Sequence, residues 1–420
     1  MKYNQRVPAV WLMGLSNSSV GLTSGIAFFV VPQMLAAQHV AESTIAVITA
    51  AAMSSNFWPV VFGPMLDVWF SRRFYATLFA ALASVLVVIS VLNLQSQAVL
   101  EVALVGGVAA AMLCTTALCG WLSTVCRDED KNKLSAWVNI AVISGTGVTS
   151  VLGAELVGHL PIRMAALILG AIVFLPAAIF LFIPSRGPDS RVAGDSFSQF
   201  LREVMTLLQS RPVLMALVLL ISPCSSFALT NLLGGLGADF HASARMVSLS
   251  GGAGAFFPGI LGCLLFPVIA RHRPLLFLYL ADGILGSLFT LSLILLPHTP
   301  ATFALALVGE YLFQAVAFSI QVGIMLETIG RNNPLAATAF TLLSASTYVP
   351  ITYMMVFDGR GYSFGGIAGS LGMDAAISIA SCLVLGFLLY RLSGKSFRMG
   401  IPAVPSLRVT PPIAPKPGLT

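Results

Sequence analysis

Long apolar runs dominate this chain and restrict it to a membrane-spanning fold. Its 420 residues are 57% hydrophobic and 9% charged, whereas soluble globular proteins carry about 25% charged residues. The runs are continuous rather than alternating, so they predict helices and not the strands of a barrel. We therefore expect an all-α membrane protein with twelve transmembrane helices in two six-helix halves. The expected spans are 8–35, 43–66, 74–94, 98–125, 134–158, 162–183, 213–235, 246–270, 274–296, 301–327, 335–357 and 365–391.

One long polar segment separates the first six spans from the last six. It predicts an N-terminal half at 1–183, a linker at 184–212, a C-terminal half at 213–392 and a tail at 393–420. In the linker, apolar residues recur at helical spacing from Phe197 to Leu208, which predicts an amphipathic helix on the membrane surface. A disordered linker is the alternative. The proline-rich tail is expected to be disordered.

Lys and Arg fall almost entirely on one side of these spans. If the N-terminus is cytoplasmic, all of the 22 except Arg163, Arg245 and Arg360 lie in cytoplasmic segments. Cytoplasmic loops are enriched in Lys and Arg, so we predict that both termini are cytoplasmic. The net charge of +6 follows from this asymmetry and does not indicate nucleic-acid binding. Neither a metal-ligand spacing nor a nucleophile–base pair is visible, so we expect no metal site and no enzyme.

The loop between the second and third spans carries a specific set of residues. It reads FGPMLDVWFSRR, in which Gly63, Asp67, Arg72 and Arg73 stand between two apolar runs. A glycine allows two helices to approach closely, and a carboxylate stabilises the positive N-terminal end of a helix. The set resembles a loop that controls access from one side of the membrane in a family of carriers, which implies that role for these four residues.

A decayed copy of this loop occurs about 199 residues later. It preserves the spacing from Gly262 to Arg271, with Phe266 at the position that corresponds to Asp67. A weak repeat in two halves is typical of carriers built from related units.

The first loop resembles the loop between helices 2 and 3 of the major facilitator superfamily, with one extra residue before the basic pair. The resemblance implies alternating access around a site lined by helices 1, 4, 7 and 10. It also implies that Asp67 lies near the N-terminus of the eleventh helix, at about 333–337. Arg72 is expected to pair with a carboxylate of residues 128–130 in the next cytoplasmic loop, and such surface pairs are worth about 0–1 kcal/mol.

Glu101, Glu155 and Asp374 lie near the ends of expected spans. Two other carboxylates stand near the bilayer middle without Lys or Arg at a similar depth. They are Asp282 in the ninth span and Glu310 in the tenth. Burying a charge in lipid is costly, so ionisable residues there are usually functional. Gln314 and Gln321 share a helix face with Glu310, which predicts a polar stripe facing a cavity. We interpret Glu310 as the proton or substrate-cation site, while Asp282 would lie at the periphery and could hydrogen-bond to a neighbouring helix.

Small polar residues also occur on the other helices expected to line the cavity. Pro223 should break the seventh helix, which would leave free carbonyl groups facing solvent or substrate. Ordinary helix packing in membranes uses the same residue types and remains the alternative for each of them. The candidates are Asn17, Ser24, Thr115, Ser222 and Ser225.

Several short segments resemble the AmpG-type muropeptide permeases and their acetyl-CoA and siderophore relatives. They read LTSG at 22–25, GEYLF at 309–313 and NPLAATAFTLLSA at 333–345. The similar muropeptide permeases carry carboxylates in the fourth and seventh helix regions, where this chain reads LCTTALCGW and SPCSS. The resemblance implies an importer, but these two departures leave its substrate open.

The sequence thus predicts a monomeric secondary transporter in a bacterial inner membrane. It would import a medium-sized organic solute with protons, driven by the proton gradient without a cofactor. Drug or metabolite efflux is an alternative, although the fifth span reads SGTGVTSVLG rather than the Gly-Pro-Gly-Gly pattern of many drug antiporters. A sensor or lipid scramblase that does not transport solutes is another.

Overall fold

The structure is a computed structural model. It describes residues 8–67, 70–184, 205–233, 236–243, 246–247, 253–271, 273–330, 333 and 335–393, in which every regular element is helical. Within these residues, eight segments are long and apolar enough to cross a membrane. One of these, α17, contains two spans, and the second, seventh and eighth spans consist of shorter helices. The prediction of twelve spans in two six-helix halves is confirmed.

The N-terminal half contains the first six spans. Pro59, which lacks a backbone N–H, begins a new helix inside the second span and accounts for the break there. The elements are α1 (Val10–Leu15), α2 (Ser18–Gly25), η1 (Ile26–Val30), α3 (Val31–Ala37), α4 (Glu42–Ser54), α5 (Pro59–Phe62), η2 (Gly63–Asp67), α6 (Arg72–Leu92), α7 (Gln97–Val125), η3 (Asp128–Asp130), α8 (Lys131–His159), α9 (Ile162–Phe174) and η4 (Leu175–Leu181).

The C-terminal half contains the last six spans. Its seventh span is broken at Pro223, as predicted. The elements are α11 (Arg211–Ile221), η5 (Pro223–Ser225), α12 (Leu229–Leu232), η6 (Gly237–Phe240), α14 (Ala253–Ile269), α15 (Leu275–Ile294), α16 (Pro300–Ile329) and α17 (Ala336–Ser393).

Helix α17 is a hairpin of two antiparallel helices. The chain reverses at Gly365 and Gly366, and Gly366 has a φ of 58°, a conformation that favours glycine. The eleventh span therefore ends several residues later than the sequence predicts. A Cβ at Gly361 would lie 2.5 Å from the carbonyl oxygen of Gly369, so the two arms approach closely beside the turn.

Gly361→Ala is expected to destabilise this hairpin, because the added methyl group would overlap the backbone of the opposite arm. Gly359→Ala is the matched control, since nothing lies within 4 Å of the Cβ that it would add. In a helix, Ala is favoured over Gly by about 0.5–1 kcal/mol. Thermal unfolding of the purified variants should show a lower Tm for Gly361→Ala and an unchanged or higher Tm for Gly359→Ala. Equal Tm values would contradict the close approach.

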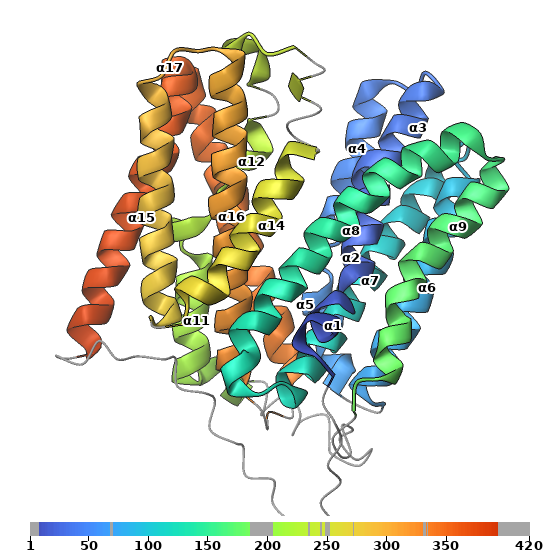
Figure 1. The fold of residues 1–420 in the computed structure, drawn as a ribbon, viewed down its shortest axis with the longest axis horizontal. Coiled ribbons are helices and arrows are strands. Elements are labelled where there is room, and N and C mark those ends of the chain that lie inside the picture. The colour runs from blue at the N-terminus through green and yellow to red at the C-terminus, as the bar shows by residue number, and fades with distance from the viewer. Residues whose placement is uncertain are drawn as a thin grey trace, which may run out of the picture.

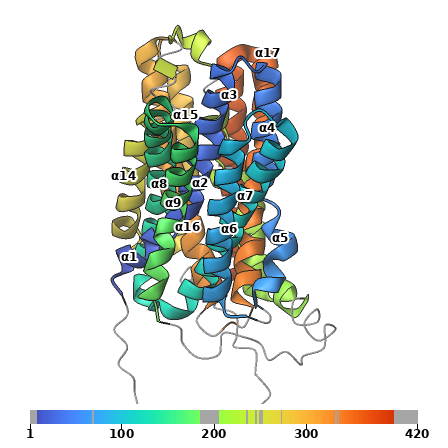
Figure 2. The same cartoon turned by 90° about the vertical axis from the view of Figure 1, so that its right-hand side faces the viewer.

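The two halves stand side by side and diverge toward one end (Figure 1). In the view turned by 90° the halves overlap, and their helices run along the same direction (Figure 2). At the other end α8 packs against α14 and α16, and α17 packs against α7 and η2. Helix α1 begins at this end, and α17 also finishes there (Figure 1). The halves are therefore joined at one end of the molecule.

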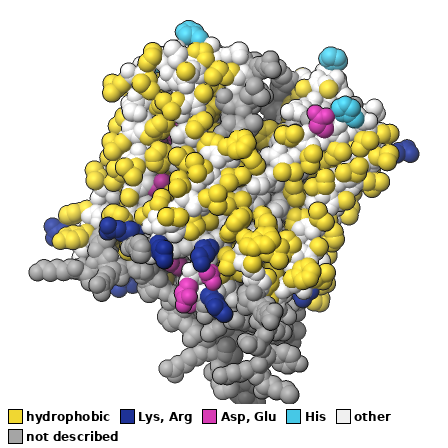
Figure 3. Space-filling model, viewed as in Figure 1, with side chains coloured by type: hydrophobic (Ala, Val, Ile, Leu, Met, Phe, Trp, Pro, Cys, Tyr) yellow, Lys and Arg dark blue, Asp and Glu magenta, His cyan; other side chains and the backbone are white. Residues whose placement is uncertain are grey.

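Lys and Arg side chains gather at the joined end, while the flanks are apolar (Figure 3). We call this end the basic end and the opposite end the far end. Large apolar side chains such as Val102 and Phe257 are exposed on the flanks. An apolar flank with basic residues at one end is the arrangement expected of a protein that lies in a bilayer. The basic residues of helix ends at this end include Arg72, Arg127, Lys131, Lys133 and Arg271.

The predicted linker helix is described only at its end. Residues 205–209 are helical, with Leu207 buried in the core and Met205 exposed. The remainder of that prediction lies outside the described residues, as does the tail after residue 393.

Candidate functional site

Asp67 ends η2 at the basic end, and its carboxylate is 1% exposed. Its Oδ1 accepts hydrogen bonds from Arg72 Nε at 2.9 Å and from Nη2 at 2.6 Å. Arg72 is itself buried in the first turn of α6. Charge-assisted bonds of this kind are stronger than neutral ones. A buried ion pair thus joins the end of η2 to the start of α6.

The same carboxylate also accepts hydrogen bonds from the other half of the molecule. Its Oδ2 accepts from the backbone N–H of Thr338 at 2.7 Å and from the Thr338 hydroxyl at 2.8 Å, and its Oδ1 accepts from the N–H of Ala337 at 3.2 Å. These N–H groups belong to the first turn of α17, where no partner exists within the helix. Asp67 therefore caps the eleventh span at the place that the family resemblance implies.

Glycines let the halves approach beside this carboxylate. A Cβ at Gly63 would lie 2.5 Å from Thr341 Oγ1, and a Cβ at Gly120 would lie 2.9 Å from Ala337 Cα. Close by, the Ser135 hydroxyl on α8 donates to the backbone oxygen of Ser319 on α16. The basic end is thus closed by polar contacts between closely packed helices.

The expected pairing of Arg72 with a carboxylate of residues 128–130 is corrected. Arg72 bonds Asp67, and its Nη2 also donates to the Asn333 carbonyl at 3.4 Å. Lys131 bridges Asp128 at 3.0 Å, and Lys133 bridges Asp130 at 2.9 Å. The carboxylate five residues before Arg72 takes precedence because the tight η2 turn places it directly beside the guanidinium.

The remaining members of the two loop copies have different surroundings. Arg73 follows Arg72 and is half-buried. In the second copy, Gly262 packs α14 against α16 within its own half, since a Cβ there would lie 2.5 Å from the Leu312 carbonyl oxygen. Phe266 is fully buried, and Arg271 is exposed. The capping contact to the other half is thus described for the first copy only.

Glu310 on α16 is 1% exposed, and its Oε1 accepts from the Thr290 hydroxyl of α15 at 2.6 Å. The opposite face of α16 carries Ser319, which meets α8 of the other half. Glu310 therefore faces the inside of the C-terminal half and not the surface between the halves. This corrects the prediction that the polar stripe of α16 faces a cavity. Sequence spacing had placed the carboxylate on a polar face but could not show which neighbours that face meets.

The two glutamines of the predicted stripe also bond within the C-terminal half. Gln314 Nε2 donates to Thr230 Oγ1 on α12 at 2.8 Å, and Gln321 Nε2 donates to the Tyr279 hydroxyl on α15 at 3.3 Å. Glu310 and Gln314 are one helical turn apart. The polar face of α16 thus connects α15 to the broken seventh span.

The backbone carbonyl groups around the break at Pro223 have hydrogen-bond partners on α17. This corrects the expectation that these carbonyls face solvent or substrate. Tyr353 Oη donates to the Ile221 carbonyl at 2.8 Å, and Ser378 Oγ donates to the Pro223 carbonyl at 3.0 Å. Cys382 Sγ lies 3.4 Å from the Cys224 carbonyl oxygen. All three donors come from α17, which thus supplies partners to carbonyl groups at the break.

Tyr353→Phe should destabilise the protein by about 1 kcal/mol, because it removes one of these hydrogen bonds and leaves the Ile221 carbonyl without that partner. Tyr390→Phe serves as the control, since Tyr390 is exposed on the same helix. Chemical unfolding of both variants in detergent micelles measures the difference. If Tyr353→Phe unfolds like Tyr390→Phe, the bond does not support the break.

The other predicted site residues are dispersed. Asn17 is buried at the junction of α1 and α2, and neither polar atom of its side chain has a hydrogen-bond partner in the structure. Ser24 and Thr115 are half-buried. Ser222 and Ser225 bond backbone carbonyls, those of Leu219 and Tyr279 respectively. Asp282 is buried on α15 with one oxygen unpartnered.

Two buried carboxylates were not among the predicted site residues. Asp358 and Asp374 lie on the two arms of α17 and are 0% and 5% exposed. Both oxygens of Asp358 and Oδ1 of Asp374 have no hydrogen-bond partner in the structure. The sequence predicts that the eleventh span ends at residue 357 and that Asp374 lies near a span end. The glycines at 359–372 were the signal for a longer hairpin with both carboxylates inside it.

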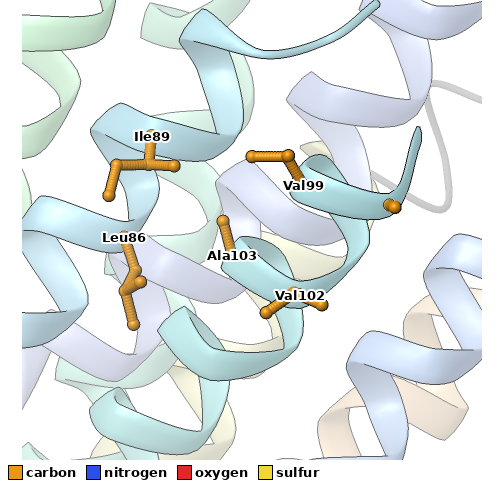
Figure 4. A pocket seen from close by; sticks show the side chains of 6 residues that line it. Leu86, Ile89, Val99, Val102 and Ala103 are labelled. Carbon is orange, nitrogen blue, oxygen red and sulfur yellow. The ribbon is translucent and has the colours of Figure 1, made fainter. Parts of the chain in front are cut away.

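An apolar hollow lies on the outside of the N-terminal half between α6 and α7 (Figure 4). Its walls offer no polar side chain, so it suits an acyl chain rather than a polar solute. It is lined by Leu86, Ile89, Ala98, Val99, Val102 and Ala103.

Comparison with solved structures identifies carriers of the same fold. The proton:xylose symporter XylE bound to 6-bromo-6-deoxy-D-glucose matches at a TM-score of 0.67 and 12% identity, over 92% of this chain and 96% of that one. The E. coli fucose:proton symporter FucP matches at 0.65 and 15%, over 92% and 98%. The human organic anion transporter MFSD10 matches at 0.64 and 14%, over 90% and 98%. At these identities the likeness shows the fold alone.

Comparison with curated protein sequences gives no significant match. A sequence model of the Major Facilitator Superfamily, in contrast, matches residues 13–334, which is more than half of the chain. This agrees with the two six-helix halves and with the capping of α17 by Asp67. The chain therefore belongs to the Major Facilitator Superfamily and is a membrane-spanning secondary transporter.

Proposed function

We propose that this transporter imports a medium-sized organic solute together with protons. It would act as a monomer in a bacterial inner membrane, with the basic end in the cytoplasm. The concentration of Lys and Arg at that end supports this orientation. Because the halves are joined at the basic end and diverge at the far end, the structure then corresponds to a carrier open to the outside.

The observation that supports proton coupling is the burial of Glu310 beside a neutral partner. Its carboxyl group is buried, and the partner that the structure shows for it is the neutral Thr290 hydroxyl. An ionised carboxylate in such surroundings is costly, so the group has reason to bind a proton when buried and to release it when water enters. Similarity of fold to two proton symporters is compatible with this role.

The solute is expected to resemble the cargo of the permeases that the sequence resembles. Asn17, buried with both side-chain polar atoms unpartnered, is the most suitable described residue to bind it, because buried polar groups require partners. The gate is assigned to Gly63, Asp67, Arg72 and Arg73, of which Asp67 joins the halves directly.

A ligand screen tests this proposal. The purified protein is heated with muropeptides, siderophores, acyl-CoA, pentoses and hexoses, and drugs, each at two pH values. A ligand that binds only the folded state raises the Tm by mass action. A hit is then loaded into proteoliposomes containing a pH-sensitive dye. Inward movement of solute with acidification of the lumen supports the proposal, whereas outward movement coupled to proton entry would favour efflux. Absence of binding by every panel would contradict it and favour a sensor or scramblase.

A further inference from the structure

The hairpin of α17 brings two carboxylates face to face. Gly361 packs against Gly369 and Met373, since a Cβ at Gly361 would lie 2.5 Å from the Gly369 oxygen and 2.9 Å from Met373 Cβ. In this antiparallel register, a step of about one turn down each arm reaches Asp358 and Asp374. Close packing of the glycines therefore places these carboxylates opposite each other inside the C-terminal half.

Glu310 belongs to the same group. Next to it, Ala306 and Leu307 of α16 share a buried apolar cluster with Leu371 of α17. Helix α16 and the second arm of α17 run in the same direction. One further turn along each of them therefore sets Glu310 beside Asp374. The charge of Asp374 acts on both Glu310 and Asp358, and that of Glu310 acts on Asp358. Three carboxyl groups from three helical arms thus form one cluster.

The described elements of the C-terminal half offer no buried cation to balance this cluster. On the described parts of α11, α12, η5, η6, α15, α16 and α17, the Arg residues are Arg211, Arg360 and Arg391, which are all exposed, and these elements carry no Lys. The N-terminal elements η2 and α7 meet the start of α17, where the charged groups are Asp67 and Arg72. Helix α8 packs on the opposite face of α16, at Ser319, and its charged or titratable groups are Lys131, Lys133, Glu155 and His159. The other titratable groups on these C-terminal elements and at their far ends are Cys224, Asp239, His241, Tyr279, Asp282, His298, Tyr311, Glu327, Tyr348, Tyr353, Tyr362, Cys382 and Tyr390.

Three like charges cannot all be ionised at close range in a medium of low dielectric constant. The cluster must therefore hold protons or another cation. Among the described residues, no group of three or more His, Cys, Asp or Glu side chains is arranged to bind a metal ion. Asp358, fully buried with both oxygens unpartnered, has capacity for a proton that its neighbours can share.

We propose that Glu310, Asp358 and Asp374 form one proton-binding site whose protons are shared and loaded from the far end. The inference rests on the proposed function, which assigns a proton to Glu310 alone. Glu310 is ten residues into α16 and Asp374 is eight residues beyond Gly366, so both lie about 12–15 Å from the far end at about 1.5 Å per residue. Loading adds a proton from water to a carboxylate oxygen, and release returns it to water.

This site has a direct connection to the broken seventh span. Gln314, one turn from Glu310, donates to Thr230 on α12. Thr290, which donates to Glu310, lies on α15 inside the C-terminal half. A change of charge in the cluster would act on the bond from Gln314 to Thr230, and through it on the position of α12. This route couples protonation within one half to movement of a helix expected to line the solute path.

Infrared difference spectroscopy of the full-length protein in lipid vesicles tests the proposal. Protonated carboxyl groups have a C=O band that disappears on ionisation, so its amplitude is followed as a function of pH. Glu310→Gln, Asp358→Asn and Asp374→Asn remove one member each. Asp282→Asn is the matched control, a buried carboxylate of the same half outside the cluster. Size-exclusion chromatography checks folding, and Asp374→Glu retains a carboxyl group if Asp374→Asn does not fold.

A shared site predicts that each cluster variant loses part of the band and also moves the pH midpoint of what remains, by about one pH unit or more. Asp282→Asn should leave that midpoint unchanged. If Asp358→Asn and Asp374→Asn leave the midpoint of the Glu310 band in place, the shared site is wrong while proton binding at Glu310 stands. If Glu310→Gln also leaves the spectrum unchanged, proton coupling at Glu310 fails as well. Loss of the band on adding Na⁺ but not choline would overturn the assignment to protons.

Discussion

Asp67→Asn is expected to open the basic end and to abolish transport. The substitution replaces one acceptor oxygen with an NH₂ group and strands the buried Arg72 without its counter-charge. Breaking a buried ion pair by removing one partner costs about 3–5 kcal/mol, which is roughly 100-fold or more in an equilibrium constant. The surface pair expected from the sequence would be worth far less. Because the pair of Asp67 and Arg72 is buried, its loss should destabilise the protein more than the loss of a surface pair would.

Hydrogen exchange at the start of α17 measures the opening, because the N–H groups of Ala337 and Thr338 donate to Asp67. Their exchange should accelerate in Asp67→Asn, together with a lower Tm. Asp130→Asn is the control, since its partner Lys133 is largely exposed and such pairs contribute little. Removing both charges in Asp67→Asn/Arg72→Gln should recover part of the lost Tm. Unchanged exchange at 337–338 in Asp67→Asn would disprove the closing role.

Glu310→Gln should abolish accumulation of solute driven by a pH gradient while leaving exchange of solute across the membrane partly intact. Glutamine can still accept the Thr290 hydrogen bond, but it cannot take up and release a proton. The structure of the site is thereby kept while its titration is removed. Accumulation in proteoliposomes should fall to the level of vesicles without protein, whereas counterflow between two solute pools should persist.

Two variants make this result interpretable. Glu155→Gln removes a carboxylate whose side chain is 69% exposed on α8 and should accumulate solute normally. Thr290→Val removes the hydrogen bond but keeps the carboxyl group, so proton-driven accumulation should survive. Normal accumulation by Glu310→Gln would show that the proton is carried elsewhere. Loss of both accumulation and counterflow would show that Glu310 is needed for solute binding or for folding.

The position of Asp67 shows how far local sequence patterns reach. Its spacing from Gly63 and Arg72 sufficed to place it at a helix connection, and the family resemblance placed it at the start of the eleventh span. The partner of Arg72, however, depended on the fold of the η2 turn, in which Asp67 and Arg72 are brought into contact. Patterns along the chain therefore located the site but not its hydrogen bonds.

The sequence by itself determined the twelve spans, the division into halves and the break at Pro223, because lipid requires long apolar helices and proline removes a backbone donor. Only the tertiary structure decided which way Glu310 faces and that Asp358 and Asp374 are both buried. A membrane helix is apolar on nearly all sides, so its periodicity does not distinguish a face toward lipid from a face toward another helix. The donors to the carbonyls around Pro223 are likewise more than 130 residues away, a distance over which local spacing carries no information.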